Sequence, residues 1–375
     1  MTNLESFEGA AVENALKDDF GSFGTPARLR VSDESMKMAN DLLGEAFAGN
    51  RMARAKVREA FSRSDFTLAA FATIDKEMRE IYQEFPSVWT QYCSQTKIKN
   101  FMPKYIVDML RGQVGLEVVP ELTEYPTVTS EASSWSINVK KYGARFAASW
   151  EAWINDDAID EIQDWPRNFA QAAAETDSIV AVSNLVSAAG INTNFFKVAN
   201  GNAPTTLPLT IDNLDAALQA IPQRKTAKGR PIYVGSMVLL VPPALEIQAQ
   251  RILSAREIRA TVGGQEVVYD NYLQGKVKLV VEPMLAVVNQ AASANTTWFL
   301  LPEPNAPRKS LYVAKLIGHE TADIRWKADQ GTRAGGGSIP VGEGSFEIDD
   351  LQVRVRHVVG GGTADPLPTY ASSGA

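Results

Sequence analysis

The sequence is poor in the residues on which most catalytic and metal sites depend. It contains one cysteine, Cys93, and two histidines, His319 and His357, in 375 residues. A single cysteine excludes an internal disulfide, and this scarcity fits a reducing compartment. No HExxH or CxxC spacing is present, so the sequence offers no metal-site motif. We predict a buried structural thiol, structural or surface histidines, no metal or cofactor, and no enzymatic activity.

Long apolar runs and an excess of basic residues are also missing. No apolar run approaches the roughly 20 residues that a bilayer-spanning helix needs, and the polar, acidic N-terminus is unlike a signal peptide. Acidic residues outnumber basic ones by 44 to 37, which gives a net charge of −7 and disfavours a basic domain that reads DNA sequence. We therefore expect a packed chain of about two domain-sized units, without a membrane partner.

The most informative segment covers residues 150–190. Asp156 and Asp157 are suited to cap a helix, because a short carboxylate accepts hydrogen bonds from first-turn N–H groups. A short helix should follow until Pro166 breaks it and opens a second helix. The second helix is predicted to run to Gly190 as its C-cap, over roughly 24 residues or about 36 Å. Because this is about twice the average helix length, we expect a structural strut.

An extended hairpin is predicted before this segment. Residues 133–142 alternate in polarity, with Trp135, Ile137 and Val139 on one face, which is the period of a half-exposed strand. Gly143 and the polar run Thr127–Ser133 suggest that this strand belongs to an extended hairpin. Because a two-stranded hairpin is marginal in water, we expect this arm to lie on a neighbouring subunit, with Trp135 and Ile137 as apolar anchors.

Helical and strand periodicity predicts two further regions. In the N-terminal part, apolar spacing predicts one helix that is capped by Ser32 or Asp33 and broken at Gly49–Asn50, then helices over Arg51–Ser64 and Thr67–Phe85. Residues 206–300 read as an α/β unit. Its expected elements are helices at Thr210–Leu218 and Leu245–Leu253 and strands at Pro231–Val241, Lys276–Val281 and Trp298–Leu301.

Several of these segments together resemble a known family. They are Trp150–Asp157, Trp165-Pro166-Arg167 with the helix to Ala189, Leu239–Leu245 (LLVPPAL) running into EIQAQRIL, Trp298–Pro304 (WFLLPEP) with the strand Leu311–Leu316, and Asp350–Val358 (DLQVRVRHV). In this order, over roughly residues 100–360, they resemble the major capsid proteins of tailed bacteriophages (Caudoviricetes) of the Hong Kong 97 (HK97) fold.

The resemblance implies an α+β, HK97-like major capsid fold. Its expected parts are an N-terminal extended arm (1–31), a helical N-terminal region (32–99), the start of the peripheral domain (100–124), an extended hairpin or E-loop (125–150), the spine helix with the peripheral domain (151–205), the axial domain (206–300), peripheral-domain strands (301–357) and a loose C-terminal tail (358–375). We expect the N-terminal helices to stay in the shell, uncut by a maturation protease.

The implied function is assembly, through pentamers and hexamers, of the icosahedral shell that encloses the double-stranded DNA of a tailed phage. The implied partners are other copies of the chain, scaffolding and portal proteins, a decoration protein as a further option, and DNA contacted non-specifically. The implied location is the virion capsid, assembled in the bacterial host cytoplasm. The alternatives are an encapsulin-type nanocompartment shell around a cargo enzyme, an α/β enzyme using the Gly-rich run Ala334–Gly344, and a tail or decoration protein.

Three groups of residues are candidates for these roles. The subunit-contact candidates are Trp135, Ile137, Val139, Lys140, Lys141, Tyr142 and Arg145. A basic helix carries Arg51, Arg54, Lys56, Arg58 and Arg63. These residues could make electrostatic contact with DNA or an acidic neighbour, although a solvated face is the favoured interpretation. Pro166, Gly190, Pro242 and Pro243 are expected to shape the backbone. Some relatives cross-link a hairpin lysine, which needs a desolvated neutral amine and a nearby carboxylate; we expect Lys140 and Lys141 to make non-covalent contacts.

Overall fold

A computed structural model of the chain describes residues 33–48, 50–61, 64–84, 87–108, 133–149, 157–226, 229, 231–262, 265–327, 332, 334–336 and 348–374. The chain divides into two units. Unit 1 comprises Met1–Glu80, Gly143–Arg167 and Gly318–Arg356, and unit 2 comprises Ile81–Tyr142, Asn168–Ile317 and His357–Ala375. Both contain helices and strands, which confirms the α+β class. None of the described helices is long and apolar enough to span a bilayer. The arm expected at 1–31 lies outside the described residues.

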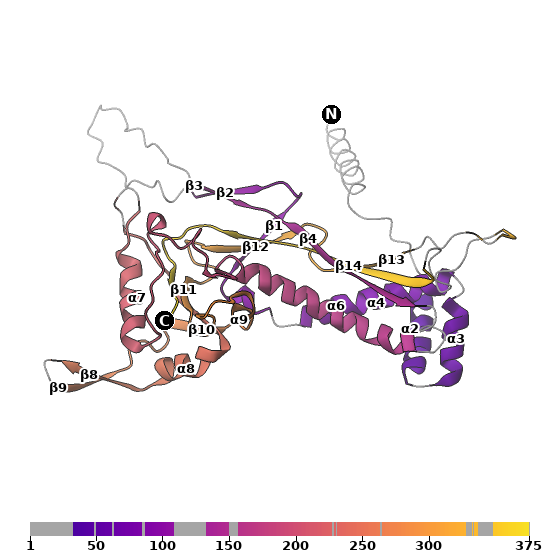
Figure 1. The fold of residues 1–375 in the computed structure, drawn as a ribbon, viewed down its shortest axis with the longest axis horizontal. Helices are drawn as coiled ribbons and strands as arrows, with labels where there is room; N and C mark the ends of the chain where they lie inside the picture. The colour runs from indigo at the N-terminus through magenta and orange to yellow at the C-terminus, as the bar shows by residue number, and fades with distance from the viewer. Residues whose placement is uncertain are drawn as a thin grey trace, which may run out of the picture. The chain divides into compact units, whose positions relative to one another are not determined.

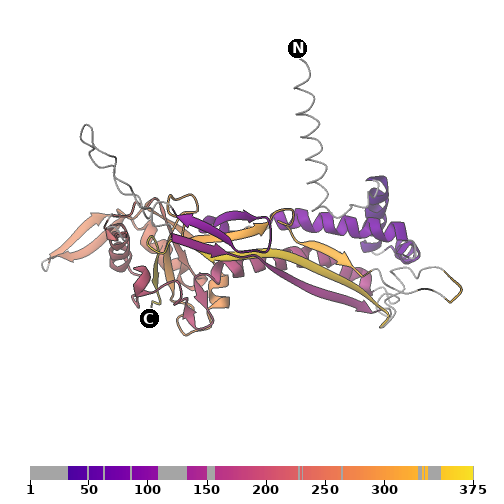
Figure 2. The same ribbon diagram turned by 90° about the horizontal axis from the view of Figure 1, so that it is seen from above.

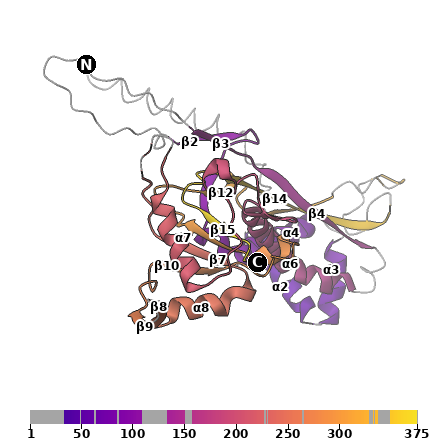
Figure 3. The same ribbon diagram turned by 60° about the vertical axis from the view of Figure 1, so that its left-hand side comes forward.

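The described part of unit 1 begins with three helices, which the sequence predicts. They are α2 (Asp33–Phe47), α3 (Arg51–Phe61) and α4 (Ser64–Glu84), the last of which ends in unit 2. Helices α2 and α3 lie side by side (Figure 3). Helical spacing places apolar side chains on one buried face of each, namely Ala39, Leu43 and Ala46 on α2 and Ala53 and Val57 on α3. Burial of these stripes, more than intrinsic propensity, stabilises such short helices.

Asn50 caps the second of these helices. Its side-chain Oδ1 accepts hydrogen bonds from the backbone N–H groups of Met52 at 3.0 Å and Ala53 at 3.4 Å. Asn50→Ala is therefore expected to cost about 1 kcal/mol of unfolding free energy, the usual value of a lost N-cap. Urea unfolding followed by far-ultraviolet circular dichroism measures the loss. Asn50→Ser, which keeps an oxygen acceptor, is the control; equal stability of the alanine and serine variants would contradict the assignment.

Strand β14 spans Asp350–Thr363, and its first half, in unit 1, pairs with β13 (Asp323–Trp326) in antiparallel orientation. On one side β13 pairs with Val353–Arg356 of β14, and on the other side β4 (Lys140–Ser149) pairs with it (Figure 1). Gly143 lies inside β4, where an added Cβ would meet Val355 O at 2.5 Å. Gly143 is thus a site of close backbone approach, and the expectation that it belongs to the extended hairpin is wrong, because β4 pairs with β14. The backbone N–H of Ile324 donates to Asp75 Oδ1 at 3.2 Å, which ties β13 to α4.

The long helix α6 is continuous from Asp157 to Val182 and contains Pro166 in its interior. The predicted break at Pro166 is therefore wrong. An interior proline costs roughly 3 kcal/mol, but Trp165 and Phe169 are both buried on this helix, and burial of each contributes about 1.5–3 kcal/mol. The burial of these two side chains therefore offsets the cost of the backbone hydrogen bond that is lost at Pro166.

The helix also ends earlier than predicted. After Val182 the amide of Asn184 donates to Val180 O at 3.1 Å and Ala181 O at 3.2 Å, which satisfies carbonyls of the last turn. Gly190 does not cap the helix. It has a φ of +114° and begins the second strand of a small hairpin, β5 (Val186–Ser187) and β6 (Gly190–Ile191).

Unit 2 is built on a four-stranded sheet of order β10-β7-β11-β15. Strand β7 (Met237–Val241) runs parallel to β10 (Val277–Val281) and antiparallel to β11 (Trp298–Pro302), which pairs with β15 (Tyr370–Ser372). Every residue of β7 is buried. Val238 and Leu240 belong to one apolar cluster, and Met237, Leu239 and Val241 belong to another. The sheet is therefore covered on both faces.

Helices contribute apolar side chains to both of these clusters. Helices α7 (Ile211–Gln223) and α8 (Glu246–Ser254) cover one face, and the end of α6 with α9 (Met284–Val288) and η1 (Val88–Gln91) covers the other (Figure 1). Thr210 caps α7, because its hydroxyl accepts from Asn213 N. Pro242 is extended and Pro243 opens a short 3-10 turn, Pro243–Leu245, that leads into α8. The predicted strand, double proline and helix are confirmed.

A second set of strands completes unit 2. Strand β1 (Ser94–Ile98) runs parallel to β12 (Leu311–Leu316), and β12 pairs antiparallel with the second half of β14. The hairpin of β8 (Glu257–Val262) and β9 (Gln265–Asp270) projects from the rest of the unit (Figure 2). A one-turn helix, η3 (Val198–Asn200), precedes the segment that leads to α7.

Two sequence-based boundaries need correction here. Strand β3 (Ser133–Ile137) pairs with the preceding β2 (Lys104–Asp108), and the chain leaves the pairing at Asn138 before β4 begins. The hairpin is thus β2–β3, and the expected continuous strand over 133–142 is interrupted. The tail expected at 358–375 is also wrong, because β14 continues to Thr363 and β15 is buried in the sheet.

Candidate subunit-interaction surfaces

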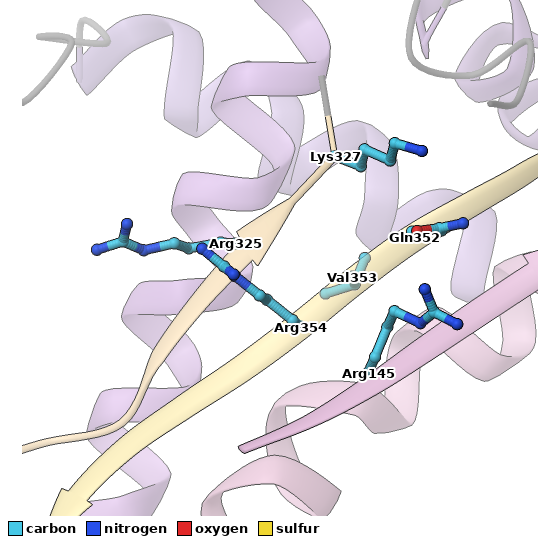
Figure 4. A pocket seen from close by; sticks show the side chains of 6 residues that line it. All are labelled: Arg145, Arg325, Lys327, Gln352, Val353 and Arg354. Carbon is cyan, nitrogen blue, oxygen red and sulfur yellow. The ribbon is translucent and has the colours of Figure 1, made fainter. Parts of the chain in front are cut away.

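A cationic cavity lies on the strands of unit 1. Its volume is about 370 Å³, and three strands supply its lining (Figure 4). We call it the cationic pocket; it is formed by Arg145 of β4, Arg325 and Lys327 at the end of β13, and Gln352, Val353 and Arg354 of β14. Four of the six lining residues carry a positive charge, so the pocket is an exception in an acidic chain.

The strand register sets two of these cations against each other. Arg325 and Arg354 are direct partners across the β13–β14 ladder, and like charges at directly opposite positions are destabilising. Asp323 partly compensates this repulsion. Its carboxylate accepts a hydrogen bond from Arg325 Nε at 2.9 Å and, through both oxygens, two hydrogen bonds from Arg356 at 2.9 Å. Burial alone would raise the pKa of Asp323, but these hydrogen bonds outweigh it and hold the pKa below its ordinary value. One carboxylate thus serves two arginines, and positive charge remains.

Two of the pocket's arginines, Arg145 and Arg354, keep an exposed positive charge. Arg145 and Arg354 are both exposed, and neither forms a hydrogen bond or ion pair involving the described part of the chain. A guanidinium presents a planar fork of donors that matches carboxylate and phosphate oxygens. The pocket is therefore suited to receive a doubly charged or paired anionic group.

The predicted subunit-contact residues divide into buried and exposed sets. Ile137 and Val139 are buried in a cluster with Ile98, Leu316 and Val358. This corrects the expectation that they contact a neighbouring subunit, because side chains in the chain's own core are not available to a neighbour. Trp135 and Tyr142 are half-buried, and Lys140, Lys141 and Arg145 are exposed. Of the seven, Arg145 lines the cationic pocket.

The described cations of the basic helix α3 differ in their exposure. Arg51 and Lys56 are exposed, whereas Arg54 is half-buried and its Nε donates to Ala46 O at 3.0 Å. Arg54 therefore satisfies a terminal carbonyl of α2, which is a structural role. The side chains of Arg58 and Arg63 lie outside the described residues. Contact of this helix with DNA or an acidic neighbour stays a prediction.

A buried ionic cluster in unit 2 was not predicted from the sequence. Lys315 Nζ lies 2.5 Å from Asp177 Oδ2, 2.9 Å from the Tyr82 hydroxyl and 3.2 Å from His357 Nε2. The same His357 nitrogen lies 2.8 Å from Asp177 Oδ1, and the Tyr82 hydroxyl also donates to Asp177. Asp177, Lys315 and His357 are all buried, so His357 is a structural histidine.

The carboxylate of this cluster stays ionised. Burial alone would raise the pKa of Asp177, but the hydrogen bond from His357 and the charge of Lys315 hold it below its ordinary value. Cys93 is buried, as predicted, and burial raises the pKa of its thiol. Within the described ranges no group of three or more histidine, cysteine or acidic side chains could hold a metal ion.

Comparison with known proteins identifies the family. A family model described as phage capsid protein matches residues 134–372, which is more than half of the chain. The comparison with curated proteins gives no match. Among solved structures, a chain of Gordonia phage Cozz gives a TM-score of 0.45 at 14% identity and covers 76% of this chain and 85% of that one.

Two further structures give similar values. A chain of Mycobacterium phage Ogopogo has a TM-score of 0.43 at 12% identity, covering 75% of this chain and 92% of that one. A virus-like particle from Pyrococcus furiosus has a TM-score of 0.43 at 12% identity, covering 80% and 98%. The assignment rests on the family match, which extends from β3 to β15. The chain belongs to the phage capsid protein family and is a structural protein of the virion.

Proposed function

We propose that the chain is the major capsid protein of a tailed phage. In this role it self-assembles through pentamers and hexamers into the icosahedral shell that encloses double-stranded DNA. The observation that carries the proposal is the family match over residues 134–372. The segment includes the long helix α6 and all strands of the four-stranded sheet of unit 2.

Assembly of one protein into a closed shell requires several different contacts per copy. Such contacts are heterologous, because one patch of a copy meets a different patch of the next copy, and they close around local rotation axes. Each contact can be weak, since many contacts per subunit act together. A cationic pocket that is only partly compensated by Asp323 and an acidic overall charge are compatible with complementary contacts of this kind.

The finer roles follow the HK97-like arrangement. The sheet of β10, β7, β11 and β15 with α7 and α8 would form the axial domain around the five-fold and six-fold axes. Helix α6 would be the spine helix, and β2–β3 would belong to the E-loop. Scaffolding and portal proteins would be partners during assembly in the bacterial cytoplasm, with a decoration protein as a further option. The packaged DNA would be contacted non-specifically.

The contents of native particles test this function against its main alternative. Particles purified from lysed host cells are treated with nuclease, opened, and analysed for protected nucleic acid and for co-purified proteins. A major capsid protein predicts protected double-stranded DNA of genome length. Particles that contain a cargo enzyme and no protected DNA would instead identify an encapsulin-type nanocompartment.

A further inference from the structure

We propose that the cationic pocket of one copy binds a pair of carboxylates, Glu77 and Glu80, on helix α4 of a second copy. The inference rests on the proposed function, because it assumes that copies of the chain pack side by side in a shell. It names a specific charged contact that such packing would use.

The acidic partner is an exposed stripe on α4. Glu77, Glu80 and Glu84 are all exposed and follow each other at helical spacing. Residues three apart on a helix lie on the same side, so Glu77 and Glu80 are neighbours. Partial burial and the charge of Glu80 raise the pKa of Glu77. The two carboxylates therefore repel each other, and a cationic partner would relieve that repulsion.

The nearby cations of α4 compensate this stripe only weakly. Lys76 Nζ lies 3.9 Å from Glu80, and both side chains are well exposed; such pairs contribute little in water. Arg79 is engaged elsewhere, because it pairs with Asp75 at 2.8 Å. Glu77 has no hydrogen bond or ion pair involving the described residues. The stripe therefore keeps negative charge available to a partner.

The spacings of the two charged sets agree. Side chains three residues apart on a helix have Cβ atoms roughly 5–6 Å apart. Directly opposite residues of an antiparallel pair, such as Arg325 and Arg354, have Cβ atoms roughly 4.5–5.5 Å apart. Figure 4 shows these two arginine side chains extending to the same side of their strands. A helix laid across the strands could thus present one carboxylate to each guanidinium, with Arg145 adding positive charge from β4.

A second copy is a better occupant than the same chain or DNA. The pocket and Glu77 and Glu80 all belong to unit 1, yet no ion pair joins the stripe to the pocket within the described residues of that unit. A chain of net charge −7 also repels the DNA backbone at long range. Pairing of one patch with a different patch is the heterologous contact that shells and rings use.

Charge reversal and its repair test the contact. The pocket variant is Arg145→Glu with Arg354→Glu, the stripe variant is Glu77→Arg with Glu80→Arg, and the swap combines all four changes. The subunit concentration at half-maximal assembly is measured by light scattering at low salt. Each two-site reversal is expected to raise this subunit concentration about tenfold or more, because close charge pairs couple strongly across interfaces. The swap is expected to return it to within about threefold of wild type.

Controls separate this contact from folding defects and from general charge effects. Circular dichroism and thermal unfolding of unassembled subunits verify that each variant folds. Lys197→Glu reverses an exposed cation of unit 2 and is expected to leave assembly near wild type. If the pocket and stripe variants assemble like wild type, or if the swap assembles no better than either, the proposal is overturned.

Two other results, reduced DNA packaging and a complete absence of shells, would bear on different claims. Pocket-variant shells that assemble normally but package less DNA would reassign the pocket to DNA contact and overturn the proposal. A wild-type chain that forms no shells under any condition would count against the proposed function itself.

Discussion

Gly360→Ala is expected to destabilise unit 2 by about 3 kcal/mol or more, beyond the usual range of a single small-to-large change. An added Cβ at Gly360 would lie 1.9 Å from Asn138 O and 2.8 Å from Val139 Cα. Both are backbone atoms of the link between β3 and β4, so rotation of a side chain cannot relieve the clash. The link would have to move away from β14, and the burial of Ile137 and Val139 beside it would be lost.

A matched glycine provides the control. Gly44 lies inside α2, and an added Cβ there meets no atom within 4 Å. Gly44→Ala is therefore expected to stabilise the chain by about 0.5–1 kcal/mol, because alanine loses less backbone entropy in a helix. Urea unfolding of both variants, followed by tryptophan fluorescence and far-ultraviolet circular dichroism, measures the two effects. A loss below about 1 kcal/mol for Gly360→Ala would refute the close crossing of the β3–β4 link over β14.

Lys315→Met is expected to cost about 3–5 kcal/mol, the usual effect of removing one partner of a buried ion pair. Asp177 has no exposed surface, so without Lys315 its carboxylate would stay buried and lose its lysine partner. Replacing both residues, as Lys315→Met with Asp177→Leu, is expected to cost less than Lys315→Met alone, because no buried charge is left unpaired. Lys76→Met, which removes the exposed partner of Glu80, should change stability by less than about 0.5 kcal/mol.

The same cluster predicts a pH dependence. Asp177 has a lowered pKa in the folded chain. Its contribution is therefore fully present above the ordinary aspartate value of about 3.9 and is lost as the pH falls through the lowered folded pKa. The stability difference between wild type and Asp177→Asn should shrink as the pH falls below about 4. A difference that grows on acidification would show that Asp177 is not held ionised by Lys315 and His357.

Local patterns in the sequence were sufficient for the helices and many strands. The apolar spacing of α2 and the buried run of β7 each report on residues that are neighbours in the chain. The Thr210 cap and the Pro242–Pro243 turn are equally local, since their chemistry acts within a few positions. Such features depend on propensity and periodicity, and a single sequence displays both.

The failures share a non-local cause. Gly360, Gly361 and Gly362 read as the start of a loose tail, because a sequence does not distinguish glycine that is flexible from glycine that allows another segment to approach closely. Pro166 read as a break because its apolar neighbours could not be assigned to a buried face.

The residues of the candidate site are also brought together by non-local contacts that the sequence does not show. Arg145, Arg325 and Arg354 come together only through strand pairing, and of these the sequence suggested Arg145 alone. Asp177 and His357 are 180 positions apart, and no spacing rule connects them. Within one strand, the pattern of β14 could have drawn attention to Arg354 and Arg356, which alternate with buried valines.

The most direct test of the central claim is electron microscopy of the chain expressed on its own and purified. A major capsid protein predicts closed shells, or free pentamers and hexamers that close into shells when a scaffolding partner is added. A stable monomer or dimer that forms no capsomers at any concentration, salt or pH would contradict the account.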